Sequence, residues 1–342
     1  MAAAPAAAGW PMGLNTYCLR ALRWNDAQLL DYAASLKLDA IFLQDSLDPK
    51  AQDPAHWKEV KAKAAELKLH LETGGGGVLP KSAELFDASV ATLRKNIERA
   101  AAMGSPLVRC VIASERSALP PGTPEQHLAT VIRMFKQVRS QVMDAGLKLA
   151  VEVHKDFQAW EFKQLVEEAG REYVGIYLDT GNPVFVLEDP RTTLEELGQY
   201  ALTLHLRDSV VYEHPRGVAV QWVPLGEGVI DFPAFLKRAQ EICPQVRVYI
   251  KPITGRPPTV LPYLEPDFWK MYPKGRAADL ARFLKIARTG RPYERNMVIE
   301  DLAGRPTPPH FVEAIKYQQR EHMERSIDYA KQKLGLGVRW RS

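Results

Sequence analysis

The sequence lacks any continuous run of about 18 uncharged apolar residues, so it predicts no helix that spans a bilayer. Cysteine is scarce, and the wide spacing of Cys18, Cys110 and Cys243 predicts buried free thiols rather than a disulfide framework or a zinc clip. No stripe of one charge is present, because acidic and basic residues alternate and the net charge is only +4. A nucleic-acid partner is therefore not expected. The 342 residues are 46% hydrophobic and 25% charged, which is typical of a globular protein.

The first nine residues, MAAAPAAAG, are low in complexity and lack the charged start and apolar centre of a signal peptide. We expect residues 1–11 to form a disordered tail. A second interpretation stays open, in which residues 2–9 are the stub of a removed export signal. The localisation is accordingly left open between the cytoplasm and the periplasm.

After this tail, short β-rich runs alternate with longer stretches in which apolar residues recur every three or four positions. This alternation is typical of repeated βα units. Eight runs are predicted as strands, over residues 12–17, 40–44, 70–73, 107–112, 148–154, 174–179, 203–207 and 246–251. Helices are predicted between them, over residues 26–36, 54–67, 82–103, 124–145, 161–169, 193–198 and 232–242.

Eight strands separated by helices predict an α/β fold, the (β/α)8 TIM barrel, with 277–288 as its eighth helix. The competing open, doubly wound sheet usually carries a glycine-rich phosphate turn after its first strand, whereas this sequence has TYCLRAL there. We therefore expect the barrel over residues 12–290. Residues 291–342 are expected to be a C-terminal helical extension, because they hold too few apolar residues for a core of their own.

Potential metal ligands lie at the carboxyl ends of three predicted strands, where the active site of a TIM barrel is found. Glu152 interrupts the apolar run LAVEV, Asp179 ends VGIYLD, and His205 interrupts LTLHL. Two carboxylates and an imidazole suit a divalent metal such as Mn, Mg, Co or Zn. A single histidine in an apolar strand is more often a core residue, so that alternative stays open for His205.

The order VEVH, YLDTGN, LHLRD and PLGEGVIDF resembles the xylose-isomerase-like TIM-barrel superfamily, often described as sugar phosphate isomerases and epimerases. The resemblance implies a metal held by Glu152, Asp179, His205 and a glutamate on strand eight. At the fourth position this sequence has Lys251 instead. Three interpretations stay open: a three-ligand metal site, a lysine that donates a proton or binds a carboxylate or enolate, or a lost metal with the lysine paired to the acids.

His154 follows Glu152 by two residues, so both side chains share one face of the strand. Superfamily branches that act on 3-keto sugars resemble this arrangement, which implies that His154 is a base; binding of a hydroxyl group or closing of a helix N-terminus is the alternative. We predict catalytic roles for His154, Lys251 and Glu152. Weaker candidates for substrate binding are Glu72, Arg109, Arg207 and Arg256.

These residues predict a metal-dependent isomerase or epimerase that moves a proton next to a carbonyl of a sugar or keto-sugar. One alternative is a lyase, either a decarboxylase or an elimination/hydration enzyme, that uses Lys251 on a 3-keto sugar or sugar acid. Another is a non-catalytic sugar-binding or partner subunit. The expected ligand is a small carbohydrate, with no membrane partner. The final predicted helix, 312–333, forms either a homodimer contact or a solvated packing helix.

Overall fold

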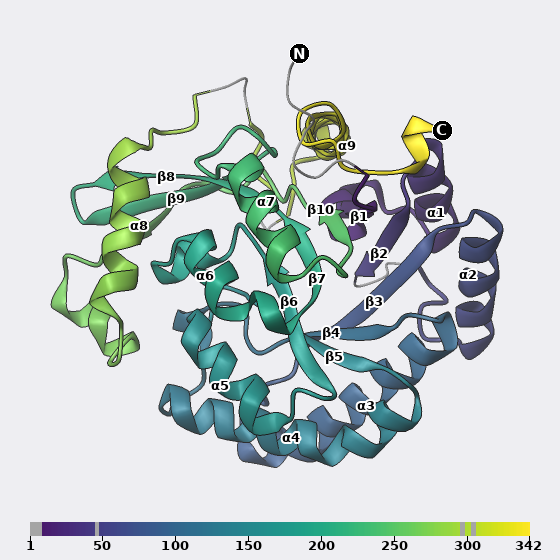
Figure 1. Ribbon diagram of the computed structural model, residues 1–342, viewed down its shortest axis with the longest axis horizontal. Coiled ribbons are helices and arrows are strands. Elements are labelled where there is room, and N and C mark those ends of the chain that lie inside the picture. Colours follow the sequence, from purple (N-terminus) through teal and green to yellow (C-terminus); the bar gives the residue numbers. More distant parts are fainter. Residues whose placement is uncertain (1–8, 45–47, 295–297, 302–305) are drawn as a thin grey trace.

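The protein, seen in a computed structural model, is described over residues 9–44, 48–294, 298–301 and 306–342. Eight parallel strands close into a barrel in the order β1-β10-β7-β6-β5-β4-β3-β2, which confirms the predicted TIM barrel (Figure 1). The barrel strands are β1 Met12–Asn15, β2 Ala40–Gln44, β3 His70–Gly77, β4 Leu107–Val111, β5 Lys148–Glu152, β6 Val174–Asp179, β7 Ala201–Leu206 and β10 Val248–Ile250.

Helices follow the strands and cover the outside of the barrel (Figure 1). They are α1 Asp26–Ser35, α2 Pro54–Glu66, α3 Phe86–Met103, α4 Pro124–Asp144, α5 Ala159–Ala169, α6 Pro190–Leu197 and α7 Phe232–Ile242. Capping residues determine where several of these helices begin. Asn25 and Thr123 each form a capping box with a glutamine three residues on, which satisfies backbone N–H groups at the first turn. Gly104 ends α3 with a φ of 75°, a conformation that glycine adopts without strain.

Side chains along each barrel strand point alternately outward and inward, and they form two separate apolar layers. Residues that face outward, such as Ile41, Val151 and Leu178, pack in the large core between strands and helices. The aromatic residues Phe42, Tyr177 and Tyr249 face inward and fill the barrel axis together with Ala40, Leu107 and Ala150. This plug of side chains leaves the carboxyl ends of the strands as the place where polar groups can gather.

A second, smaller sheet lies beside the barrel and was not predicted. Strands β8 Asp208–His214 and β9 Gly217–Val223 form an antiparallel hairpin after β7, and β11 Thr259–Leu261 pairs with β9. Helix α8 Ala277–Thr289 packs against β8, and the two share a separate apolar cluster (Figure 1). The prediction that 277–288 is the eighth barrel helix is therefore wrong, because this helix covers the outer sheet.

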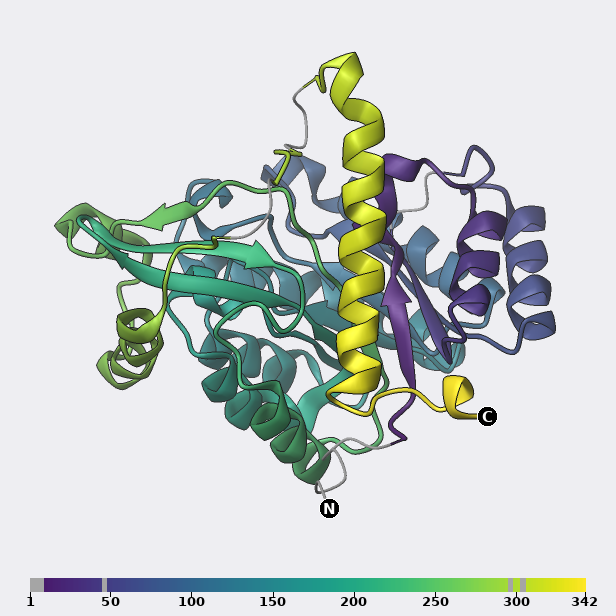
Figure 2. The same cartoon turned by 90° about the horizontal axis from the view of Figure 1, so that it is seen from above.

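The last long helix, α9 Pro309–Gln332, takes the place next to the eighth barrel strand. It contacts β10 and the 3₁₀ helix η1 Thr16–Leu22, and Figure 2 shows it running alongside β1. The C-terminal helix is thus present, and it closes the barrel wall. The domain boundary at residue 290 stays a prediction. No helix among the described residues is both long enough and apolar enough to cross a membrane.

The beginning of the described chain is built into this wall. The expected disordered tail over 1–11 falls mostly outside the described residues, which begin at Gly9. From there the chain is packed: Trp10 is buried, and its indole Nε1 donates to the carbonyl of Val246 at 2.6 Å. The backbone N–H of Gly9 donates to Gly335, and that of Gly337 donates to Trp10. For residues 9–11 the expectation is corrected.

Candidate active site

A cavity of about 600 Å³ opens at the carboxyl ends of the barrel strands. The sequence-predicted residues that line it are Arg109, Glu152, His154, Arg207, Lys251 and Arg256. Three predicted residues, Glu72, Asp179 and His205, are not part of this lining. The size suits a small ligand such as a sugar.

Lys251 forms the centre of the cavity floor. Its Nζ donates to Glu152 Oε1 at 2.7 Å and to Asp179 Oδ2 at 3.1 Å, and it lies 4.8 Å from the centroid of the Tyr177 ring. All three charged side chains are almost completely buried. A lysine that comes directly after β10 therefore binds both predicted metal carboxylates.

Two arginines complete this cluster. Arg109, on β4, donates from Nε to Glu152 Oε2 at 2.5 Å, and from Nη1 to the carbonyl of Gly75 at 2.8 Å. Arg207 lies 3.2 Å from Asp179 Oδ2 through Nη2. Each carboxylate thus has one arginine of its own and shares the ammonium of Lys251. Two carboxylates and three cations leave this buried cluster with one extra positive charge.

The charges have opposite effects on the titration of these groups. Burial acts to raise the pKa of the Glu152 carboxyl, but Arg109 and Lys251 outweigh burial and hold that pKa well below its ordinary range. Burial lowers the pKa of Lys251, and the attraction of Glu152 offsets only part of this effect. The cluster therefore holds ionised carboxylates beside an ammonium that gives up its proton more readily than a surface lysine.

Asn182 is a part of the site that the sequence analysis did not assign. Its Nδ2 donates to the carbonyl of Val153 at 2.9 Å and lies 3.3 Å from Glu152 Oε1, while its Oδ1 accepts from Arg207 Nη1 at 3.0 Å. It thus fixes the carboxylate of β5 relative to the arginine after β7. Its place three residues after Asp179, at the end of a strand, is the signal that could have identified it.

His205 does not join the two carboxylates. Its ring stacks between Tyr177 and Tyr249, at centroid distances of 3.8 Å and 4.7 Å, and its Nε2 lies 3.2 Å from Thr203 Oγ1. Burial, followed by the charge of Lys251, lowers its pKa well below the ordinary value. The structure therefore places His205 in the aromatic plug beneath the cavity floor, as a core histidine.

The donor set consequently does not fit a divalent metal. The carboxylates of Glu152 and Asp179 are occupied by three cations, and His205 is turned into the core. Among the described residues, Glu152, Asp179 and His205 are not close enough together to share an ion. The predicted three-ligand site at the barrel mouth is thus corrected, and of the three interpretations the salt-bridged lysine matches this geometry.

Glu72 is also placed elsewhere. It is buried on β3 beside Phe42 of β2 in the strand register, and its Oε1 lies 3.4 Å from His70 Nε2. The predicted contact of Glu72 with substrate is therefore not supported by the geometry, because the side chain belongs to the barrel interior and not to the cavity.

His154 is the one imidazole that lines the cavity. It follows β5 and is half-buried, and its Nδ1 has no hydrogen-bond partner among the described residues. Burial lowers its pKa to about 3; Glu152 opposes the shift, and Lys251 adds to it. At neutral pH the ring is uncharged and has a free lone pair, as a proton acceptor requires.

The outer sheet supplies one wall of the cavity. Gln221 and Trp222, on β9, line it, and the indole Nε1 of Trp222 donates to the carbonyl of Gly181 at 2.9 Å. The position of Trp222 depends on a hairpin that was not predicted. The hairpin therefore shapes one wall of the cavity.

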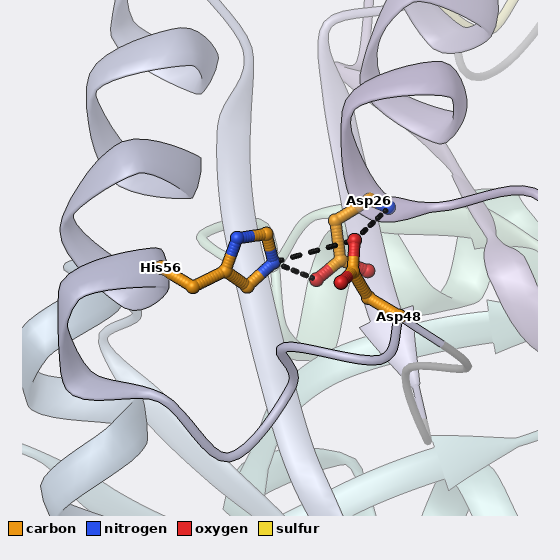
Figure 3. A group of neighbouring side chains, drawn as sticks. All are labelled: Asp26, Asp48 and His56. Atoms are coloured by element: carbon orange, nitrogen blue, oxygen red, sulfur yellow. Dashed lines mark hydrogen bonds and ion pairs between the residues drawn. The ribbon is translucent and has the colours of Figure 1, made fainter.

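Within the described chain, one group of carboxylates and imidazole does lie close enough to share a cation: Asp26, Asp48 and His56 (Figure 3). His56 Nε2 lies 3.0 Å from Asp26 Oδ2 and 3.5 Å from Asp48 Oδ2. Burial opposes protonation, but the two aspartates raise the pKa of His56. The cluster joins the start of α1 to the start of α2, outside the cavity, and a protonated histidine satisfies it as an ion-pair contact.

A family profile described as "Xylose isomerase-like TIM barrel" matches residues 30–246. The chain belongs to this family. Its sequence is also 25% identical to the uncharacterized protein YihM of Escherichia coli (strain K12) over 194 residues. That match covers 55% of this chain and 53% of YihM, so it spans about half the length of the curated relative.

Solved structures of similar fold include sugar epimerases. A D-psicose 3-epimerase, solved in the presence of D-fructose, covers 95% of this chain and 99% of its own, with a TM-score of 0.63 and 14% identity. A barrel of the family from Mycobacterium smegmatis, solved in complex with magnesium, covers 70% of this chain and 89% of its own, with a TM-score of 0.53 and 15% identity. At these identities the likeness shows the shared fold. Binding of a divalent metal is thus known within the fold.

Proposed function

We propose that this protein is an enzyme that transfers a proton next to the carbonyl of a keto-sugar, with Lys251 supplying the positive charge at the reacting centre. The observation that carries the proposal is the buried Lys251 ammonium, held between two carboxylates on the floor of a sugar-sized cavity with an uncharged His154 on its wall. Membership of a family that includes sugar isomerases and epimerases supports the same class of reaction.

In this mechanism His154 is the base. A carbon next to a ketone is acidic because the electron pair left behind spreads onto the carbonyl oxygen as an enediolate. The uncharged imidazole accepts that proton, and the cations Lys251 and Arg109 stabilise the oxygen that becomes negative. Arg109 and Asn182 fix the carboxylate of Glu152, which in turn holds the ammonium in place.

The return of the proton decides the product. If Lys251 donates its proton to the enediolate, the outcome is isomerisation or epimerisation. If the enediolate instead expels a group from the neighbouring carbon, the outcome is elimination, which is the lyase alternative. The lowered pKa of Lys251, caused by burial, favours donation and is compatible with both outcomes.

A second candidate is a sugar-binding subunit without catalysis. The observation in its favour is that Lys251 is fully paired, since Glu152 and Asp179 both accept from it. In such a subunit Lys251 would only balance charge on Glu152 and Asp179, and the cavity would still bind a carbohydrate.

The test is exchange of the hydrogen next to the ketone in D2O, followed by NMR on 3-keto-D-glucose, D-fructose and the charged keto-sugar D-fructose 6-phosphate. We expect exchange by the wild type, and a loss of 10²-fold or more in His154→Gln and in Lys251→Met. Arg171→Gln, an exposed residue in the loop that leads into β6, is the matched control and should retain the rate. Sugars that bind to the wild type without exchanging would favour the binding subunit.

A further inference from the structure

The cavity lining includes a half-buried arginine whose side chain has no partner in the described part of the chain. Arg256 follows β10 and lines the cavity, and its guanidinium makes no hydrogen bond or ion pair with the described residues. The carboxylate that influences it most, Asp301, is already paired with Arg20. Burial and the charge of Arg20 lower the pKa of Arg256, so its surroundings do not compensate its charge.

Two more cations line the cavity beside Trp222. The guanidinium of Arg207 lies 4.4 Å from the ring centroid of Trp222, and Lys155 Nζ lies 5.4 Å from that centroid. Arg207 Nε is buried and has no hydrogen-bond partner among the described residues. Gln221, the neighbour of Trp222 on β9, donates to the backbone carbonyl of Arg256 at 2.9 Å, which holds the chain at Arg256 against β9.

The other cationic side chains of the cavity lining have carboxylate partners, whereas Arg256 has none among the described residues. Those four are Arg109, Lys155, Arg207 and Lys251, and they pair with Glu115, Glu152 and Asp179. The charge of Arg256 therefore lies at a partly enclosed cavity without an ion pair from the described chain, where an anion is attracted more strongly than at an open surface.

We infer that Arg256 binds a negatively charged group of the substrate, a carboxylate or a phosphate ester. The proposed function supplies the premise that the same cavity holds the reacting carbonyl, so the substrate is an anionic keto-sugar. Arginine is suited to this role because its planar guanidinium donates two parallel hydrogen bonds to a carboxylate or phosphate. Trp222 offers an apolar face between the charges on which a sugar ring can stack.

Equilibrium binding tests the inference without needing turnover. Isothermal titration at constant low ionic strength would compare D-glucuronate, D-glucose 6-phosphate, inorganic phosphate and uncharged D-glucose. We expect at least one anion to bind tenfold or more tightly than D-glucose, and Arg256→Gln to remove most of that preference. The stronger of the two charged sugars identifies carboxylate or phosphate as the group that is recognised.

The controls separate this inference from the proposed function. Arg171→Gln removes an exposed arginine outside the cavity lining and should leave the anion preference unchanged. Wild-type protein that binds no anion more tightly than D-glucose, or an Arg256→Gln variant that behaves like Arg171→Gln, would overturn the inference. Preferential anion binding in a protein that catalyses no hydrogen exchange would leave the inference standing and overturn only the proposed function.

Discussion

Lys251 Nζ and Glu152 Oε1 lie 2.7 Å apart on the floor of the barrel mouth, at the carboxyl ends of β10 and β5. A direct ion pair therefore stands where the resemblance to the superfamily implied a shared metal. The two residues differ in what their removal leaves behind. Without Lys251, Glu152 still has Arg109 as a partner. Without Glu152, both Lys251 and Arg109 lose a partner.

This difference predicts that two substitutions lower the free energy of unfolding by different amounts. Glu152→Ala leaves excess positive charge in a buried site and should lower the free energy of unfolding by about 3–5 kcal/mol. Lys251→Met removes a buried charge while each carboxylate keeps an arginine, so its cost should be clearly smaller. Urea denaturation of both variants checks the order. Equal losses would mean that the cluster is not organised as two arginine–carboxylate pairs.

Replacing Lys251 with an acidic residue should create affinity for a divalent metal. Lys251→Glu removes the ammonium and adds a carboxylate beside Glu152 and Asp179. Titration with Mn²⁺ is expected to raise the melting temperature of this variant, because a ligand that binds the native state stabilises it, and to leave the wild type nearly unchanged. Both proteins would carry Asp26→Asn, so that the separate cluster with His56 contributes nothing. A wild type that responds as strongly as the variant would contradict the poor metal fit.

His154 predicts a loss of stability in acid. Its pKa is about 3 in the folded protein and about 6.5 in an unfolded chain, so the unfolded state binds more protons below pH 6.5. The protein therefore keeps its full stability with respect to His154 above pH 6.5, and loses stability through this residue as the pH falls toward 3. His154→Gln should therefore lose less stability than the wild type between pH 6.5 and 4. Parallel pH profiles in denaturant would count against a neutral, buried imidazole.

His56 predicts the opposite dependence. Asp26 and Asp48 raise its folded-state pKa above the unfolded value, so its ion pairs stabilise the protein fully below about pH 6.5 and weaken as the pH rises through the raised value. In His56→Gln this alkaline loss should disappear, while the wild type retains it. Melting temperatures from pH 5 to 9 provide the comparison, and identical curves would refute the protonated ion pair.

The periodicity of the sequence was enough to predict the barrel because each strand is a short apolar run followed by a helix of regular spacing. It also placed Glu152 and His154 correctly on one face. The position of His205 along the barrel axis could not be predicted from periodicity. Thr203, His205 and Arg207 share a face, and only the stagger of closed strands decides which of them reaches the mouth. Here that residue is Arg207, while His205 lies among Tyr177 and Tyr249.

The hairpin of β8 and β9 was missed although its sequence carried a signal. Its two runs, DSVVYEH and GVAVQWV, are rich in β-branched residues and are separated by a short Pro-Arg turn. Since the hairpin covers Phe283 and other apolar residues of α8, the same omission assigned α8 to the barrel wall.

The contacts of α9 with β10 and η1 affect how the barrel can form during synthesis. The region around Trp10 and the first barrel strand is covered by residues made much later, including Gly335 and Gly337. A nascent chain therefore exposes an open apolar seam until α9 and the residues after it have been made. During that interval the incomplete barrel is prone to aggregate.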